Sequence, residues 1–143
     1  MGIEPFLVTS TLSAILAQRL IRKICSHCRE QVAVSWEQLE KLNFQKIIKP
    51  KDYSGQLWHG RGCEKCLNTG YSGRTGIYEL LIFNDQLRKA VQKSADATQI
   101  KKVTLEQKMK TLQFDCAQKV LEGTTTIDEM LRVVYSDQNP QEN

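Results

Sequence analysis

The sequence predicts an α+β fold, in which a small tetracysteine zinc subdomain with a short antiparallel β pair precedes a helical C-terminal subdomain. Three observations lead to this prediction. Two Cys-x-x-Cys pairs, Cys25/Cys28 and Cys63/Cys66, lie far apart in the chain. Residues 75–82 are rich in β-branched and aromatic residues, which favours a strand. From Asn84 onward, apolar residues recur at the three- and four-residue spacing of helices.

The two cysteine pairs have the spacing of a metal site. Each pair brings two thiols to one spot, and together they supply four soft sulfur ligands, which suits tetrahedral Zn²⁺. The alternatives are a thioredoxin-like redox motif, a disulfide framework and an iron–sulfur cluster. A redox motif normally needs one such pair beside a βαβ unit, and a disulfide framework belongs to a secreted chain. An iron–sulfur cluster normally needs three clustered cysteines. We interpret Cys25, Cys28, Cys63 and Cys66 as ligands of a closed structural zinc site with no position left for substrate.

Composition indicates an ordinary globular protein. The 143 residues are 41% hydrophobic and 25% charged. With no signal peptide and no apolar run long enough to span a bilayer, we expect a cytosolic chain. Residues 1–75 contain 11 Lys and Arg against 6 Asp and Glu, whereas residues 76–143 contain 9 against 10. The basic residues near the cysteines either offset the −2 charge of a Zn-tetrathiolate or form a face for nucleic acid or lipid headgroups. They are Lys23, Arg29, Arg61 and Lys65.

The first 24 residues predict a strand and a helix. Residues 4–8 are apolar around Pro5, so we expect them to be extended, and Thr9-Ser10 is suited to an N-cap. A helix is then expected through Ile24, because its apolar positions recur at three and four. These elements cannot bury themselves alone. They either complete a domain that begins elsewhere or pack on the later helices.

The stretch between the cysteine pairs predicts one helix and one strand. Ser35 followed by Gln38 is a capping-box pattern for a short helix that ends near Asn43. Residues 45–55 are expected to form a surface connection, and residues 56–59 a strand. We expect residues 57–60 to pair with 75–82 in antiparallel fashion.

Glycines follow the second cysteine pair. Gly70, Gly73 and Gly76 allow a tight path and close backbone approach beside it. The segment is not a phosphate-binding loop, because it lacks the Gly-Lys-Ser/Thr ending and a strand follows it.

Four helices are expected, the first beginning at Asn84 or Asp85 and the others near Asp96, Thr111 and Thr126. Thr126 with Glu129 is a capping-box pattern. Gly123 is expected to end the third helix. The last should turn Ile127, Met130, Leu131 and Val134 inward. Cys116 lies on an apolar helix face, so we interpret it as a core residue. His27 and His59 are poor ligand candidates, and we find no catalytic site.

Taken together, these motifs resemble the C-terminal third of the assembly ATPases of bacterial type II secretion and type IV pili, and the type II secretion ATPases in particular. The match covers nearly the whole chain. The segments with the resemblance are residues 1–8, 17–20, 25–28, 62–66, 70–81, 109–112, 119–123, 125–126 and 131–133. Relatives commonly have Gly at the position of Lys108 and Asp-Gly at that of Asp115-Cys116, so the turns there are expected to differ.

The resemblance implies a division into three parts. Residues 1–24 would end a RecA-like ATPase core, residues 25–82 would form the tetracysteine zinc subdomain, and residues 83–143 the helical C-terminal subdomain. It also implies that Cys25, Cys28, Cys63 and Cys66 hold structural Zn²⁺. ATP and Mg²⁺ would bind only in the parent ATPase, through motifs upstream of this region. Met1 would correspond to an internal methionine of that parent.

The resemblance further implies partners and a location. The chain would associate with the rest of its own hexameric ATPase and with an inner-membrane platform protein, peripheral to the cytoplasmic face of the bacterial inner membrane. The machine would be that of type II protein secretion, which builds a pseudopilus. The alternatives are a free-standing zinc module that binds nucleic acid and a thiol redox sensor. We disfavour nucleic acid as a partner because the aromatic residues are scattered.

Overall fold

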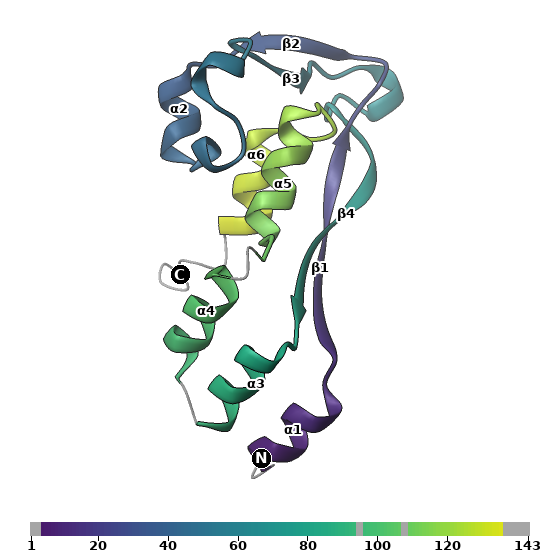
Figure 1. Ribbon diagram of the computed structural model, residues 1–143. Coiled ribbons are helices and arrows are strands. Elements are labelled where there is room, and N and C mark those ends of the chain that lie inside the picture. The colour runs from purple at the N-terminus through teal and green to yellow at the C-terminus, as the bar shows by residue number, and fades with distance from the viewer. Residues whose placement is uncertain (1–3, 94–95, 107–108, 136–143) are drawn as a thin grey trace, which may run out of the picture. The chain divides into compact units, whose positions relative to one another are not determined.

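The computed structural model describes residues 4–93, 96–106 and 109–135 (Figure 1). Its contacts divide the chain into two compact units. Residues 1–18 and 78–111 form the first unit, and residues 19–77 and 112–143 form the second. The two units are defined by the contacts between residues and do not test the three-part division expected from the family resemblance, which stays a prediction.

The first unit consists of three helices and the outer parts of two long strands. The helices are α1 (Pro5–Thr11), α3 (Asp85–Gln92) and α4 (Ala97–Glu106). The strands are β1 (Ala14–Ile24) and β4 (Tyr71–Ile82), which pair in a two-stranded sheet. Two hydrogen bonds join α3 to the start of the chain. Arg88 donates to the carbonyl of Leu12 at 3.0 Å, and Gln92 donates to the Thr9 hydroxyl at 3.1 Å.

The structure reverses the order expected for residues 4–24. The segment around Pro5 is helical, and the following apolar segment is a strand. Proline fits the first turn of a helix, where its missing N–H has no partner to lose. The three- and four-residue spacing in 12–24 favoured a helix, but pairing with β4 determines the observed conformation.

The second unit contains a β hairpin, a short helix and the last helices. Strands β2 (Arg29–Ala33) and β3 (Gln56–Gly60) are antiparallel, with Arg29 opposite Gly60 and Ala33 opposite Gln56. Helix α2 (Trp36–Lys41) follows, and 3₁₀ turns span Phe44–Lys46 and Pro50–Asp52. Helices α5 (Leu112–Leu121) and α6 (Ile127–Met130) come later, and a π-helical turn continues α6 over Leu131–Tyr135.

The expected pairing of residues 57–60 with 75–82 is wrong. Strand β3 pairs with β2, and β4 pairs with β1. Neither partner strand was predicted, because the segment 29–33 is short and the apolar residues of β1 have a helix-like spacing. Both partners depend on contacts between distant parts of the chain.

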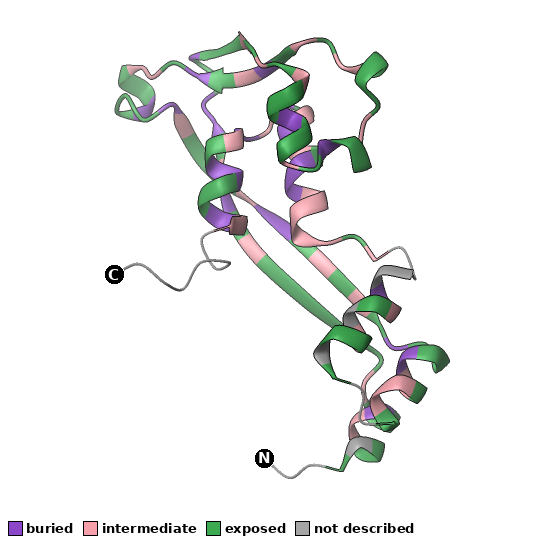
Figure 2. Ribbon diagram, turned by 90° about the vertical axis from the view of Figure 1, so that its left-hand side faces the viewer, coloured by how far each residue is buried: buried purple, intermediate pink, exposed green. Residues whose placement is uncertain are grey.

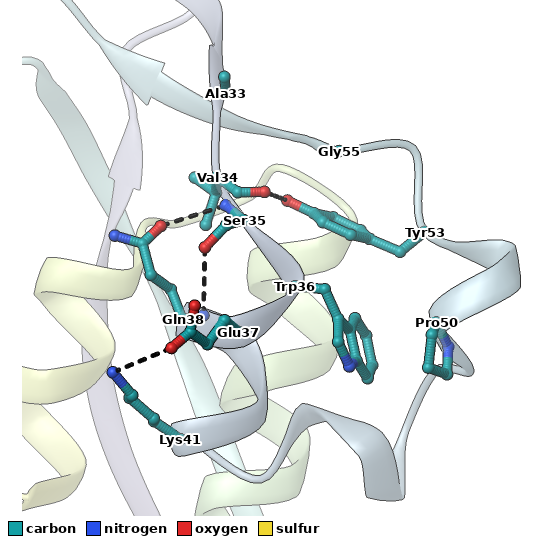
Figure 3. Close-up of a pocket in the computed structure, with 10 residues that line it drawn as sticks. All are labelled: Ala33, Val34, Ser35, Trp36, Glu37, Gln38, Lys41, Pro50, Tyr53 and Gly55. Carbon is teal, nitrogen blue, oxygen red and sulfur yellow. Dashed lines mark hydrogen bonds and ion pairs between the residues drawn. The ribbon is translucent and has the colours of Figure 1, made fainter.

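Several local predictions are confirmed. Ser35 and Gln38 form the reciprocal capping box of α2 (Figure 3), and Asn84 caps α3. Helix α5 ends at Gly123, which has φ +72°. There the Thr124 amide donates to Lys119 and the Gly123 amide to Val120, as in a Schellman motif. Leu131 was expected to face inward but is 38% exposed. The turn expected at Lys108 lies outside the described residues.

One hydrophobic core fills the second unit. It joins Ile21 of β1, Leu39 of α2, Leu57 of β3 and Ile77 of β4 to the last two helices. Figure 2 marks buried residues along these elements in purple. The remaining core residues are Phe44, Cys116, Ala117, Val120, Met130 and Val133. The strand and helix segments that carry the cysteines therefore rest on a shared core.

Candidate metal centre

The four predicted cysteines meet in the second unit. Cys25 directly follows β1 and Cys28 directly precedes β2, so the first pair forms the turn between two strands. Cys63 precedes a 3₁₀ turn, Glu64–Cys66, which ends at Cys66. Their sulfur atoms all lie within 4.8 Å of one another. Three of the four cysteines are buried, and Cys63 is partly exposed.

The spacing of the sulfur atoms fits one tetrahedral ion. The Sγ–Sγ distances are 4.0 Å for Cys25 and Cys63, 3.9 Å for Cys28 and Cys66, and 3.7 Å for Cys63 and Cys66. Zn–S bonds of about 2.3 Å give a tetrahedron with edges of about 3.8 Å. A disulfide needs sulfurs about 2.05 Å apart, and all five cysteines are free. An iron–sulfur cluster would place several atoms between the sulfurs, which are too close for that.

Backbone amides point at two of the sulfurs. The Gly62 amide donates to Cys28 Sγ at 3.3 Å. The amides of Cys63 and Gly70 donate to Cys66 Sγ at 3.2 and 3.3 Å. Amide N–H groups favour the charged form of a sulfur that accepts from them. This is the environment that a metal-bound thiolate requires.

Close contact between backbones joins the two cysteine turns. The Cys25 amide donates to the Gly70 carbonyl at 2.9 Å, and the Arg61 amide donates to the Cys28 carbonyl at 3.0 Å. A Cβ on Gly60 would collide with the Gly70 carbonyl, and a Cβ on Gly70 would collide with the Gly60 carbonyl. Gly70 also has φ +77°. The predicted close approach is therefore confirmed at Gly70, with Gly60 as its counterpart.

The environment shifts the pKa values of Cys28 and Cys66 in opposite directions. Burial and hydrogen bonds from the other cysteines raise the pKa of Cys28 to about 12. Burial also opposes ionisation of Cys66, but the amides of Cys63 and Gly70 outweigh it and lower the pKa of Cys66 to about 6. Four thiolates repel one another in so small a space unless a cation balances their charge. The donor set therefore suits a divalent soft-metal ion.

A buried ionic cluster lies in the same unit and was not expected from the sequence. Glu129, fully buried, accepts from the Arg22 amide and Nε at 2.9 and 2.8 Å. It also accepts from Arg132 Nε and Nη2 at 2.9 and 2.6 Å. Burial opposes the charge, but the hydrogen bonds from Arg132 and Arg22 lower the pKa of Glu129 to about 2. The cluster joins β1, which leads to Cys25, to the last helix.

A second contact holds the hairpin to the end of α5. The Arg29 guanidinium lies 3.8 Å from the centroid of the Trp58 ring. Gly123 packs against both side chains, and any Cβ there would collide with them. Trp58 is therefore a packing residue.

The other candidate residues stay apart from the cysteine cluster. Cys116 is fully buried in the core, and its pKa is raised to about 12, mainly by burial. His27 and His59 are both exposed. The predictions that Cys116 is a core residue and that His27 is exposed are confirmed.

A pocket of about 850 Å³ opens beside α2, and Figure 3 shows the residues that line it. The Tyr53 hydroxyl donates to the Val34 carbonyl at 2.9 Å, and the Trp36 and Tyr53 ring centroids are 6.1 Å apart. Glu37 and Lys41 form an exposed ion pair at its edge. The Ser35 hydroxyl accepts from the Gln38 amide, so the polar groups named here are each engaged in local contacts.

Comparison with known proteins places the chain in a family. A family model described as "Type II/IV secretion system protein" matches residues 1–132. The chain belongs to this family. Among its relatives, the Type IV pilus assembly ATPase PilB of Thermus thermophilus is 40% identical over 131 residues, which are 92% of this chain and 14% of the relative.

Two further relatives carry the name Type II secretion system protein E. The protein of Aeromonas hydrophila is 38% identical over 137 residues, and that of Dickeya dadantii is 40% identical over 137 residues. Each alignment covers 96% of this chain and 26% of the relative. The chain thus spans about a quarter or less of the relatives' length. Within the described residues, no helix has the length and apolar character needed to cross a bilayer.

Proposed function

We propose that this chain is the zinc-binding and helical C-terminal portion of an assembly ATPase for type II secretion or type IV pili. It serves as a structural and interaction module without a catalytic site of its own. The observation that carries the proposal is the tetrahedral spacing of four cysteine sulfurs in a member of this family.

Zinc in this proposal would be held by Cys25, Cys28, Cys63 and Cys66. The ion would neutralise the thiolates and cross-link two turns that are distant in sequence. Structural zinc stabilises small sites by about 10–16 kcal/mol, which is comparable with the stability of a whole domain. The cysteines themselves fix the direction in which β1 and β2 leave the site. The metal thus sets the fold of the second unit and takes no part in chemistry.

The surface of the first unit supports the interaction role. Seven large apolar side chains there are at least 44% exposed. Three of them, Tyr78, Leu80 and Ile82, alternate along β4 and therefore share one strand face. The others are Phe6, Leu7, Ile15 and Leu16. This number of exposed apolar side chains in one unit favours a partner, and the remaining three quarters or more of the parent ATPase is our candidate.

The wider assignment follows from the same proposal. ATP and Mg²⁺ would bind in the parent outside this chain, and the parent would work as a hexamer against an inner-membrane platform protein at the cytoplasmic face. Nucleic acid is not a partner in this scheme. The name of the relatives and the placement of Cys25, Cys28, Cys63 and Cys66 support it.

Metal analysis combined with thiol counting tests the zinc assignment. We expect protein purified without added metal to contain one zinc per chain. In the native state no thiol should react rapidly, because zinc would protect four and Cys116 is fully buried with a raised pKa. All five cysteines should react after chelation in denaturant.

Two results would contradict the proposal. Protein without metal, whose cluster thiols react at once, would indicate a redox site. Hydrolysis of Mg-ATP by the purified chain would show that it has a catalytic site after all. A chain with zinc and no ATP hydrolysis is the expected result.

A further inference from the structure

A pocket lined by arginines, with no cysteine in its lining, lies in the second unit. It encloses about 430 Å³, and its lining residues are Leu20, Arg22, Arg74 and Arg132. Leu20 and Arg22 belong to β1, Arg74 to β4, and Arg132 to the π-helical turn after α6. Three guanidinium groups from three separate segments therefore converge on one space.

The charges in this pocket do not balance. Glu129 lies beside it and offsets one of the three positive charges, which leaves an excess of two. Its carboxylate is fully buried and already accepts from Arg22 and Arg132, so it has little capacity for a further cation. Among the described residues, Arg74 has no hydrogen-bond or ion-pair partner.

Glu129 also fixes the arginines in position. Arg22 uses Nε and Nη2 to contact the carboxylate, and Arg132 uses the same two atoms. The Arg22 guanidinium lies 4.1 Å from the centroid of the Tyr71 ring. A guanidinium has five N–H donors, so both groups keep donors that Glu129 does not occupy. These donors are held in place before any ligand arrives, which reduces the entropy cost of binding.

We propose that Arg22, Arg74 and Arg132 form a binding site for a phosphoryl group. A phosphate monoester carries a charge of −1.5 to −2 at pH 7 and three strong acceptor oxygens, which match the excess charge and the three arginines. A single carboxylate has half that charge and two oxygens. A nucleic-acid strand needs a basic groove along its backbone, whereas these three arginines converge on one space.

Calorimetric titration of the zinc-containing chain with inorganic pyrophosphate tests the site. Arg74→Gln should weaken binding about tenfold or more, because a charge-assisted hydrogen bond is lost. The fold should stay intact, since Arg74 has no partner among the described residues. Arg61→Gln is the matched control, because Arg61 is exposed and lies outside the pocket. It should change the affinity less than twofold.

Vesicles distinguish a soluble phosphate from a lipid headgroup. We would sediment the chain with phosphatidylcholine vesicles, with and without phosphatidic acid. Binding to pyrophosphate alone assigns the pocket to a soluble phosphate ester, and Arg74-dependent binding to phosphatidic acid assigns it to a headgroup. Failure of both ligands to bind would overturn the proposal, as would equal weakening by Arg74→Gln and Arg61→Gln. The zinc content is measured separately, so this failure leaves the proposed function unaffected.

Discussion

The two compact units differ in how far their apolar side chains are buried. In the second unit, ten buried hydrophobic residues form one cluster, and three buried cysteines form another. In the first unit, Phe83 and Leu87 are the described hydrophobic residues that are buried. Seven large apolar side chains of that unit are at least 44% exposed.

This difference shows which part of the chain specifies its own fold. The second unit combines a hydrophobic core, a cysteine cluster and a buried ion pair network, and each of them joins segments that are distant in sequence. The first unit has short helices and a strand pair whose apolar residues remain in contact with water. We therefore expect substitutions to lower the free energy of unfolding strongly in the second unit and only slightly on the exposed strands of the first.

The largest effect is expected when a cysteine of the cluster is lost. Cys63→Ser should release the metal and unfold the second unit, because structural zinc contributes about as much free energy as a whole domain has. The unfolding should include α5 and α6, since their residues share the core with β1, β3 and β4. Metal content and thermal unfolding by circular dichroism measure this.

Cys116→Ser is the matched control, because it makes the same chemical change outside the cluster. It should lower the melting temperature through the buried hydroxyl and leave the zinc content at one per chain. The four-ligand assignment is wrong if Cys63→Ser keeps its zinc and its melting curve.

Loss of the buried carboxylate is expected to have the next largest effect. Glu129→Gln leaves two arginines without their counter-ion and should lower the free energy of unfolding by about 3 kcal/mol at pH 7. The pKa of Glu129 falls from 4.5 in the unfolded chain to about 2 in the folded one. Its stabilising contribution is therefore complete above pH 4.5 and decreases as the pH falls toward 2.

The measurement is the difference in unfolding free energy between wild type and Glu129→Gln at several pH values. The comparison uses pH values at which both proteins keep their zinc, because loss of the metal in acid would unfold the second unit in both. Asp115→Asn is the control, because Asp115 pairs with Lys119 on a partly exposed helix surface, and it should cost less than about 1 kcal/mol. A Glu129→Gln variant that is as stable as the wild type at pH 7 would contradict the low pKa.

The glycine contact between the cysteine turns is expected to have a smaller effect. Gly70→Ala and Gly73→Ala form a matched pair, since these glycines have φ values of +77° and +74°. A Cβ on Gly73 meets nothing within 4 Å, whereas one on Gly70 meets the Gly60 backbone. Gly73→Ala should cost about 1 kcal/mol for the backbone conformation alone, and Gly70→Ala about 2 kcal/mol or more. If chemical denaturation gives equal losses of unfolding free energy for the two variants, the close approach of Gly70 to Gly60 does not affect stability.

Local sequence signals predicted much of this structure. Ser35 with Gln38, Asn84 and Gly123 each mark a helix end through contacts within a few residues, and all three are confirmed. The cysteine spacing predicted which four sulfurs would meet. Each of these signals involves residue types whose geometry leaves few alternatives.

Contacts between distant segments were not predictable in the same way. The apolar spacing of residues 12–24 is compatible with a helix, and only the partner strand β4 makes β1 a strand. Glu129 was expected to complete a capping box with Thr126, yet its side chain reaches Arg22. A capping pattern gives no information about which charged groups tertiary packing will bring near.

The smallest effect is expected at an exposed apolar side chain of β1 in the first unit. Leu16 of β1 is 59% exposed, so Leu16→Gln removes little buried surface and should change the free energy of unfolding by less than about 0.5 kcal/mol. Leu87→Ala in the same unit is the contrast, because Leu87 is fully buried and its truncation should cost about 2–5 kcal/mol. Sedimentation velocity should accompany the unfolding curves. If Leu16→Gln costs as much as Leu87→Ala and also dissociates an oligomer, a second copy of this chain covers Leu16, and the case for the parent ATPase as the partner of this surface fails.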